Sequence, residues 1–177
     1  MTRYAAFLRA INTGNRTVRM ETLREIFEGL GFANAATLLA SGNVIFDAAS
    51  KNAAALEQRL EETLGRELGF DTPVILRTLA QLKAALAHPA LAARSSYTSV
   101  NVAFTRPAVS DAGRAALAKF ETGSDWFHVA GGEVIWLSRL KQSESEFSNN
   151  ALEKAAKVQS TIRTVQTVEK ILDKYGR

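Results

Sequence analysis

Residues 4–46 have the sequence YAAFLRAINTGNRTVRMETLREIFEGLGFANAATLLASGNVIF, in which several structural signals follow one another. The apolar run at 4–11 ends in a turn rich in Asn and Gly and predicts a strand buried on both faces. Apolar residues at helical spacing then predict a helix over 20–30, with Gly31 at its C-terminal cap. The runs 37–40 and 44–46 flank Ser41-Gly42-Asn43 and predict a hairpin.

The next segment completes one structural unit. A stripe of leucines predicts a second helix that opens near Ser50 and closes near Gly65 or Gly69. A fourth strand is predicted over 73–77, with proline at its first position, where a missing N–H donor costs least. The resulting βαββαβ order is that of the split βαβ, or ferredoxin-like, unit.

The same order returns after a short helix that a capping-box pattern opens at Thr78–Gln81. The predicted elements are strand 100–104, a helix from Ser110, strands 126–129 and 134–137, a helix after a capping-box pattern at 143–146, strand 161–163 and a terminal helix over 165–175. We therefore expect an α+β fold of two tandem ferredoxin-like (βαββαβ, α/β-plait) subdomains with an extra C-terminal helix. The expected boundaries are 1–79 for the first subdomain, 80–94 for a helical connector and 95–177 for the second subdomain with its C-terminal helix.

Each such unit places both helices on one face of its sheet and leaves the other face to be covered. Val134 and Trp136 fall on one side of their strand by the period-two rule. On this basis we expect the open faces of the two halves to pack on each other.

Composition narrows the function classes. The 177 residues are 46% hydrophobic and 23% charged, which is typical of a soluble globular protein and excludes disorder, collagen and coiled coil. The absence of cysteine excludes disulfides, thiolate nucleophiles and Cys-ligated metals, and two histidines are too few for a multi-histidine metal site. We expect no metal and no cofactor. Charged residues interrupt the first residues too early for a signal peptide, so a cytoplasmic protein without a membrane partner is predicted, as a monomer or homodimer.

Positive charge is concentrated at the start of the chain. The net charge is +4, and residues 1–20 alone contain four arginines and no acidic residue. The segment 9–19, RAINTGNRTVR, can turn backbone N–H groups inward, precedes a helix N-terminus and offers arginine forks. It predicts a site for a small anionic or phosphorylated ligand, with Ser41-Gly42-Asn43 beside it if the sheet order brings the two loops together. The candidate ligand-binding residues are Arg9, Asn12, Gly14, Asn15, Arg16, Arg19, Ser41, Gly42 and Asn43.

Other readings of the same residues stay open. The glycines and asparagines also fit plain turn geometry, with solvated arginines around them. A loop of amides and arginine beside an asparagine is similar in kind to the phosphoryl site of an acylphosphatase, which makes a phosphoryl hydrolase the enzymatic alternative. A third class is a protein or nucleic-acid interaction module that uses an open sheet or the basic C-terminal helix. No catalytic residue is assigned, and no nucleotide-binding fingerprint is present.

Several of these segments together resemble the uncharacterised bacterial family DUF1697. They are 7–14 (FLRAINTG), 18–20 (VRM), 23–24 (LR), 30–32 (LGF), 41–46 (SGNVIF) and 70–75 (FDTPVI), with looser similarity at 152–154, 161–163 and 167–170. The resemblance implies two linked α/β-plait halves and no particular reaction, and it adds Arg163 to the candidate residues as a motif match. The chain departs from the family pattern at Ala10 and Asn15, where glycines are common, and at Thr164-Val165-Gln166, where Asn-Trp-Asn is common.

Overall fold

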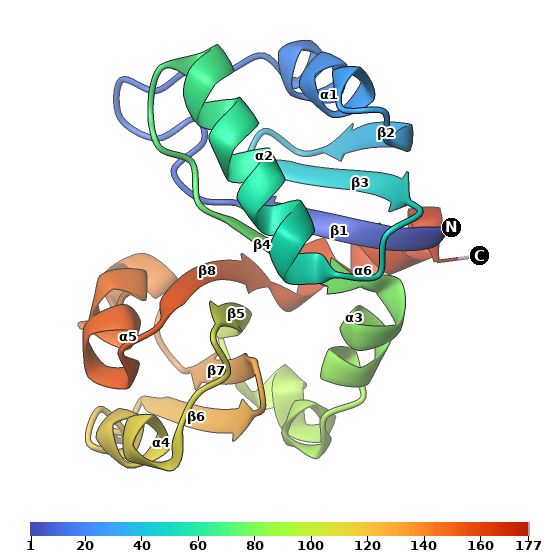
Figure 1. Ribbon diagram of the computed structural model, residues 1–177. Coiled ribbons are helices and arrows are strands. Elements are labelled where there is room, and N and C mark those ends of the chain that lie inside the picture. Colours follow the sequence, from blue (N-terminus) through green and yellow to red (C-terminus); the bar gives the residue numbers. More distant parts are fainter. Residues whose placement is uncertain (177) are drawn as a thin grey trace. The chain divides into compact units, whose positions relative to one another are not determined.

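The computed structural model describes residues 1–176, whose contacts divide the chain into two compact units. The first unit comprises Met1–Leu82 and the end of the chain from Tyr175, and the second comprises Lys83–Lys174. Each unit contains its own four-stranded sheet with helices (Figure 1).

The first unit follows the expected βαββαβ order. Its elements are β1 (Thr2–Leu8), α1 (Met20–Gly29), β2 (Ala33–Leu38), β3 (Asn43–Ala48), α2 (Ala53–Leu68) and β4 (Val74–Thr78). The sheet has the order β2-β3-β1-β4, and all of its neighbouring strands are antiparallel. This is the ferredoxin-like arrangement that the sequence predicts.

Local signals set the ends of the helices in this unit, and one shared core holds them on the sheet. The side chain of Asn52 accepts the N–H of Ala55 at the start of α2, and Gly69 ends that helix with a φ of 77°. Buried residues of α1, α2 and one face of the sheet form a single hydrophobic cluster. At its centre, the ring of Phe46 lies 4.6 Å from that of Phe32 and 5.2 Å from that of Phe27, between ring centroids.

The second unit repeats the plan. Its elements are β5 (Ser99–Arg106), α4 (Asp111–Ala118), β6 (Asp125–Ala130), β7 (Glu133–Ser138), the 3₁₀ turn η2 (Gln142–Glu144), α5 (Asn149–Ala156) and β8 (Gln159–Thr164). The sheet order is β6-β7-β5-β8, again antiparallel throughout. Two tandem ferredoxin-like halves are thus confirmed.

The core of the second unit corrects one inference about its sheet. Val134 and Trp136 do share one side of β7, but they pack in the cluster with Leu117 of α4 and Leu152 of α5. These two residues therefore belong to the helix-covered face and give no support to packing of the opposite face. Packing of the two halves on each other stays a prediction.

Helical segments join and follow the two sheets. In sequence order, α3 (Leu79–Leu86) and the 3₁₀ segment η1 (Pro89–Ser96) connect β4 to β5, and the extra helix α6 (Val165–Tyr175) follows β8. The capping box expected at the start of α3 is present, because the Thr78 N–H donates to Gln81 Oε1 at 2.8 Å and the Gln81 N–H donates to Thr78 Oγ1 at 3.2 Å.

Several local predictions differ from the structure. The strand expected at 37–40 is β2, which runs from Ala33 to Leu38 and leaves Leu39 and Ala40 in the turn. The first strand ends at Leu8, so Arg9–Ile11 belong to the following loop. Asn43 is the first residue of β3 and not part of the turn. The pattern at 143–146 does not open α5, since Ser148 caps that helix through the Ala151 N–H. Ser148 directly precedes the first residue of α5, so its hydroxyl reaches the free N–H groups of the first turn, whereas Ser143 lies five residues before Ser148.

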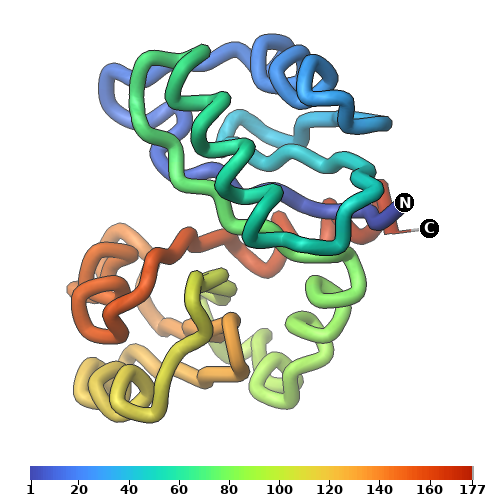
Figure 2. Tube along the Cα trace, in the orientation of Figure 1, coloured from blue at the N-terminus to red at the C-terminus, as the bar shows by residue number. Residues whose placement is uncertain are grey.

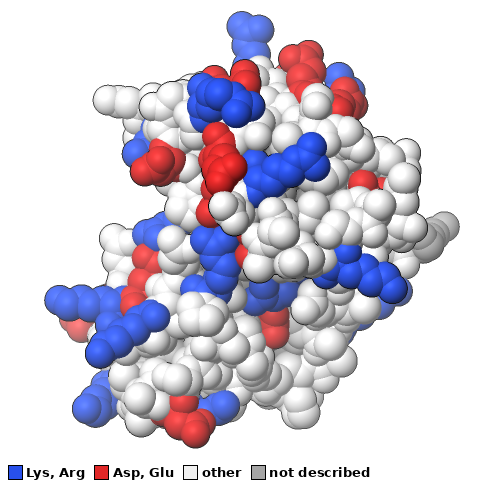
Figure 3. Space-filling view, viewed as in Figure 1, with Lys and Arg blue, Asp and Glu red and all other residues white. Residues whose placement is uncertain are grey.

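Two features of the whole described chain bear on function. Within residues 1–176, no helix combines the length and apolar character needed to cross a membrane. Over the face seen in Figure 3, Lys and Arg side chains are interspersed with Asp and Glu.

Candidate functional site

Three loops of the first unit meet at one end of its sheet: 9–19 after β1, 39–42 between β2 and β3, and 69–73 before β4. The Leu8 N–H donates to the Gly42 carbonyl and the Arg9 N–H to the Pro73 carbonyl, each at 2.9 Å. Figure 2 shows the chain after β1 passing beside the green segment that leads into β4. The sheet order thus does bring the two predicted loops together.

Asn12 ties loop 9–19 to the β2–β3 turn. Its Nδ2 donates to the Ala40 carbonyl at 2.8 Å, and its Oδ1 accepts the Val18 N–H at 2.7 Å. Both polar atoms of the side chain are therefore hydrogen-bonded to backbone, and Asn12 stabilises the conformation of the loop.

Ser41, Gly42 and Asn43 hold the turn itself. Asn43 is fully buried, and its Nδ2 donates to the Leu38 carbonyl and to Ser41 Oγ, both at 2.9 Å. Gly42 has a φ of +77°, and a Cβ there would lie 3.0 Å from the Cβ of Ile11. These contacts agree with the turn-geometry reading of the three residues.

The outer part of loop 9–19 faces solvent. Gly14, Asn15, Arg16 and Arg19 are exposed, and Arg9 is half-exposed. Every second residue from 10 to 14 has a positive φ: 58° at Ala10, 54° at Asn12 and 59° at Gly14. Backbone that alternates in this way can direct neighbouring N–H groups to the same side, which is the geometry of an anion-binding concavity.

The start of α1 adds partial positive charge beside this loop. Arg19 occupies the N-cap position and makes no side-chain hydrogen bond to the helix, in contrast to the cap residues of α2, α4 and α5. No side chain at the N-cap position therefore accepts the first N–H groups of α1, which carry the positive end of the helix dipole. Glu21 in the first turn offsets part of that charge.

Arg16 is positioned by an aromatic ring that sequence analysis did not single out. The guanidinium carbon lies 4.8 Å from the centroid of Phe70, in the loop that follows α2. The resemblance at 70–75 was the only signal in the sequence that pointed to this segment.

Arg163 lies in the second unit, on β8, and is not part of this loop cluster. Its Nη1 donates to Thr161 Oγ1 at 2.7 Å and to the Ile162 carbonyl at 2.9 Å. Burial lowers the pKa of Arg163 to about 10, so its guanidinium is still charged at neutral pH. The neighbouring departure from the family pattern, Thr164-Val165-Gln166, lines a pocket of about 400 Å³ with Arg94 and Glu169.

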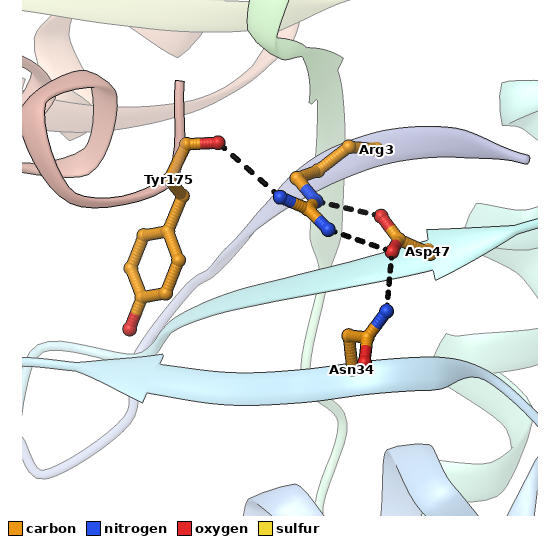
Figure 4. A network of polar contacts seen from close by, with 4 residues as sticks. All are labelled: Arg3, Asn34, Asp47 and Tyr175. Atoms are coloured by element: carbon orange, nitrogen blue, oxygen red, sulfur yellow. Dashed lines mark hydrogen bonds and ion pairs between the residues drawn. The ribbon is translucent and has the colours of Figure 1, made fainter. Parts of the chain in front are cut away.

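Arg3, which contributes to the basic start of the chain, is neutralised at the opposite end of the first sheet. Figure 4 shows its guanidinium paired with both oxygens of Asp47, at 2.7 and 2.8 Å, while Asn34 Nδ2 donates to the same carboxylate at 2.8 Å. The Arg3 hydrogen bonds hold the pKa of Asp47 below its usual value and raise the pKa of Arg3. Arg3 also contacts the Tyr175 carbonyl at 3.4 Å. The arginines left to loop 9–19 and the start of α1 are thus Arg9, Arg16 and Arg19.

The architecture defines a protein of two ferredoxin-like halves with a basic loop and an uncapped helix start in the first half. The chain belongs to the DUF1697 family, described as proteins of unknown function, whose model matches residues 1–136. It is also similar in structure to a conserved bacterial protein from Streptococcus pneumoniae. That likeness has a TM-score of 0.75 and 26% sequence identity, and covers 100% of this chain and 99% of the other. No curated protein matches the sequence.

Proposed function

We propose that this chain is a cytoplasmic protein that binds a small anionic or phosphorylated ligand at loop 9–19 of the first unit. The observation that carries the proposal is the start of α1, where no side-chain cap is present and Arg16 and Arg19 are exposed beside it. Backbone N–H groups at a helix start and planar guanidinium forks are the donors that phosphate and carboxylate groups use.

The loop is built to keep these donors in place before a ligand arrives. Asn12 fixes the loop to the β2–β3 turn, and the Phe70 ring supports the Arg16 guanidinium. Such support lowers the ordering cost of binding, because fewer side-chain rotamers have to be frozen when the ligand arrives.

The contacts of the two asparagines bear on the acylphosphatase-like alternative. Asn12 uses both polar atoms of its side chain to bind backbone, and Asn43 is fully buried. Asn12 thus serves to hold the loop, and Asn43 is out of reach of the loop surface, so binding without turnover is the function we put forward. Acyl-phosphate turnover above buffer that Asn12→Ala abolishes in a folded protein would instead support the hydrolase.

The test is a thermal-shift screen with inorganic phosphate, phosphosugars, nucleotides, simple carboxylates and short oligonucleotides at low and high salt. Arg16→Ala with Arg19→Ala removes two positive charges from the proposed site. Arg24→Ala with Arg66→Ala is the matched control, since these arginines are exposed on α1 and α2 and the change in net charge is the same.

A ligand at 100 times its dissociation constant stabilises the folded state by about 2.7 kcal/mol, which raises the Tm of a chain of this size by several degrees. We expect one class of small anion to give this shift in the wild type and in the control, and not in the Arg16/Arg19 variant. Equal shifts in both double variants would refute the site. A response to oligonucleotides alone that falls steeply with salt would favour the nucleic-acid alternative, because phosphate contacts release counterions.

A further inference from the structure

The chain contains two histidines, and the second unit brings them together. His88 lies between α3 and η1, and His128 lies on β6, the edge strand of the second sheet. Their ring centroids are 5.9 Å apart, with 45° between the ring planes. Both rings line a pocket of about 220 Å³.

The bonding of His88 decides which kind of ligand the pair accepts. Its Nδ1 accepts the Ala90 N–H at 3.1 Å, so Nδ1 carries no proton. In a neutral imidazole the proton then sits on Nε2, which is a hydrogen-bond donor. A metal ion at Nε2 would place the proton on Nδ1 and break the Ala90 hydrogen bond, which disfavours a cation.

Arg114 gives the pocket a fixed positive charge. Its Nη1 donates to the Val129 carbonyl at 2.8 Å, which anchors the guanidinium on the edge strand that carries His128. Among the described residues that line the pocket there is no acidic side chain. In addition, residues 1–176 contain no cluster of three His, Asp or Glu side chains that could hold a metal ion.

The rest of the lining is apolar. Leu117 and Ala118 of α4 and Phe127 of β6 border the pocket beside the three polar side chains. Leu117 is fully buried and Phe127 nearly so, and both belong to the hydrophobic core of the second unit. The pocket therefore combines a donor-rich rim with an apolar wall.

We propose that this pocket is a second anion site, which binds the phosphate group of a small phosphomonoester or free inorganic phosphate. Arg114 and the Nε2–H of His88 donate to the phosphate oxygens, His128 closes the other side, and the apolar wall contacts the organic part of an ester. The site is separate from loop 9–19, because all of its residues belong to the second unit.

The histidines themselves provide the readout. With only two in the chain, a nitrogen-correlated NMR spectrum of the imidazole rings contains two ring patterns, which are assigned with His128→Gln. Inorganic phosphate and phenyl phosphate are titrated at constant pH and ionic strength, and zinc chloride is titrated separately. Arg114→Gln is the site variant, and Lys119→Gln, exposed just beyond α4, is the control with the same change in net charge.

We expect phosphate to shift both ring patterns, and Arg114→Gln to weaken the apparent affinity about tenfold, since a charge-assisted contact is lost. His128→Gln keeps the protein folded because the residue is exposed, and it should weaken binding as well. Lys119→Gln and the Arg16/Arg19 double variant should leave the ring shifts as in wild type. Tighter binding of phenyl phosphate identifies a phosphomonoester as the ligand, and equal binding identifies free phosphate.

Three results would overturn the proposal. Ring signals that do not move with either phosphate compound exclude the site. Ring shifts that survive Arg114→Gln unchanged place the anion elsewhere. Saturable zinc binding at the rings, with no response to phosphate, makes the pair a cation site.

Discussion

Replacing Gly42 by alanine tests how the proposed ligand loop is fixed to the sheet. Gly42 has a φ of +77°, and an alanine Cβ would lie 3.0 Å from Ile11 Cβ and 3.2 Å from Leu8 Cβ. Gly14 is the matched control, because its φ is also positive, at +59°, while its Cβ position has nothing within 4 Å. The two substitutions share the backbone cost and differ in packing.

The magnitudes follow from these two contributions. A left-handed conformation costs a residue with a Cβ about 1–2 kcal/mol, part of which is returned by the lower entropy of the unfolded chain, so Gly14→Ala should reduce the free energy of unfolding by about 1 kcal/mol. Gly42→Ala adds overpacking of about 1–3 kcal/mol, for an expected loss of about 2–4 kcal/mol. Ile11 and Leu8 cannot retreat easily, because both are buried and the Leu8 N–H donates to the Gly42 carbonyl at 2.9 Å.

The assay has to report on the first unit. Both tryptophans, Trp126 and Trp136, lie in the second unit, so their fluorescence is a poor probe of this change. We would measure urea unfolding by far-UV circular dichroism, together with hydrogen exchange in peptides from β1 and β3. Equal losses of stability for Gly14→Ala and Gly42→Ala would refute the packing argument, and a neutral Gly14→Ala would refute the backbone argument.

Three further predictions concern stability. Ala10→Gly should raise the free energy of unfolding by about 0.5–1 kcal/mol, because Ala10 has a φ of 58° and glycine relieves that conformation; a lower urea midpoint would contradict this. Asp47→Asn should cost about 1 kcal/mol at neutral pH through loss of the ion pair with Arg3, whose groups are partly exposed. The pKa of Asp47 is lowered in the folded state, so the ion pair contributes fully to stability above the ordinary carboxylate pKa of about 4. This contribution is lost as the pH falls through the lowered pKa. The difference in free energy of unfolding between wild type and Asp47→Asn should therefore close in acid and not widen. Ser148→Ala should lower the free energy of unfolding by about 1 kcal/mol, because the N-cap of α5 is lost, whereas Ser143→Ala should change it little. A larger loss for Ser143→Ala than for Ser148→Ala in urea unfolding would show that Ser143 caps the helix.

Much of the fold is encoded locally. The apolar run of β1, the helical spacing of α1 and the capping box at Thr78–Gln81 predict their elements because periodicity and cap chemistry act within a few residues. Local signals were weakest at boundaries. Ala10 and Ile11 continue the apolar pattern of β1, but the chain leaves the sheet at Leu8, where β1 pairs with Val74 at the start of β4.

The candidate site shows a different balance between sequence and tertiary structure. Composition and loop chemistry were enough to select segment 9–19 and the turn before β3, since both carry turn residues and one carries arginines. Which of those residues face a ligand could not be chosen in this way. Asn12 is engaged with Ala40 and Val18, Asn43 is buried, and Arg16 lies over Phe70.

The sequence by itself therefore determined two βαββαβ units, a basic loop after the first strand and the exclusion of cysteine chemistry. Only the tertiary structure paired Arg3 with Asp47, tied Asn12 to Ala40 and placed His88 beside His128. The physical reason is the distance along the sequence over which each interaction acts. Helix periods, caps and turns depend on neighbours along the chain, whereas these pairs depend on strand order and register, which are set by how whole elements pack.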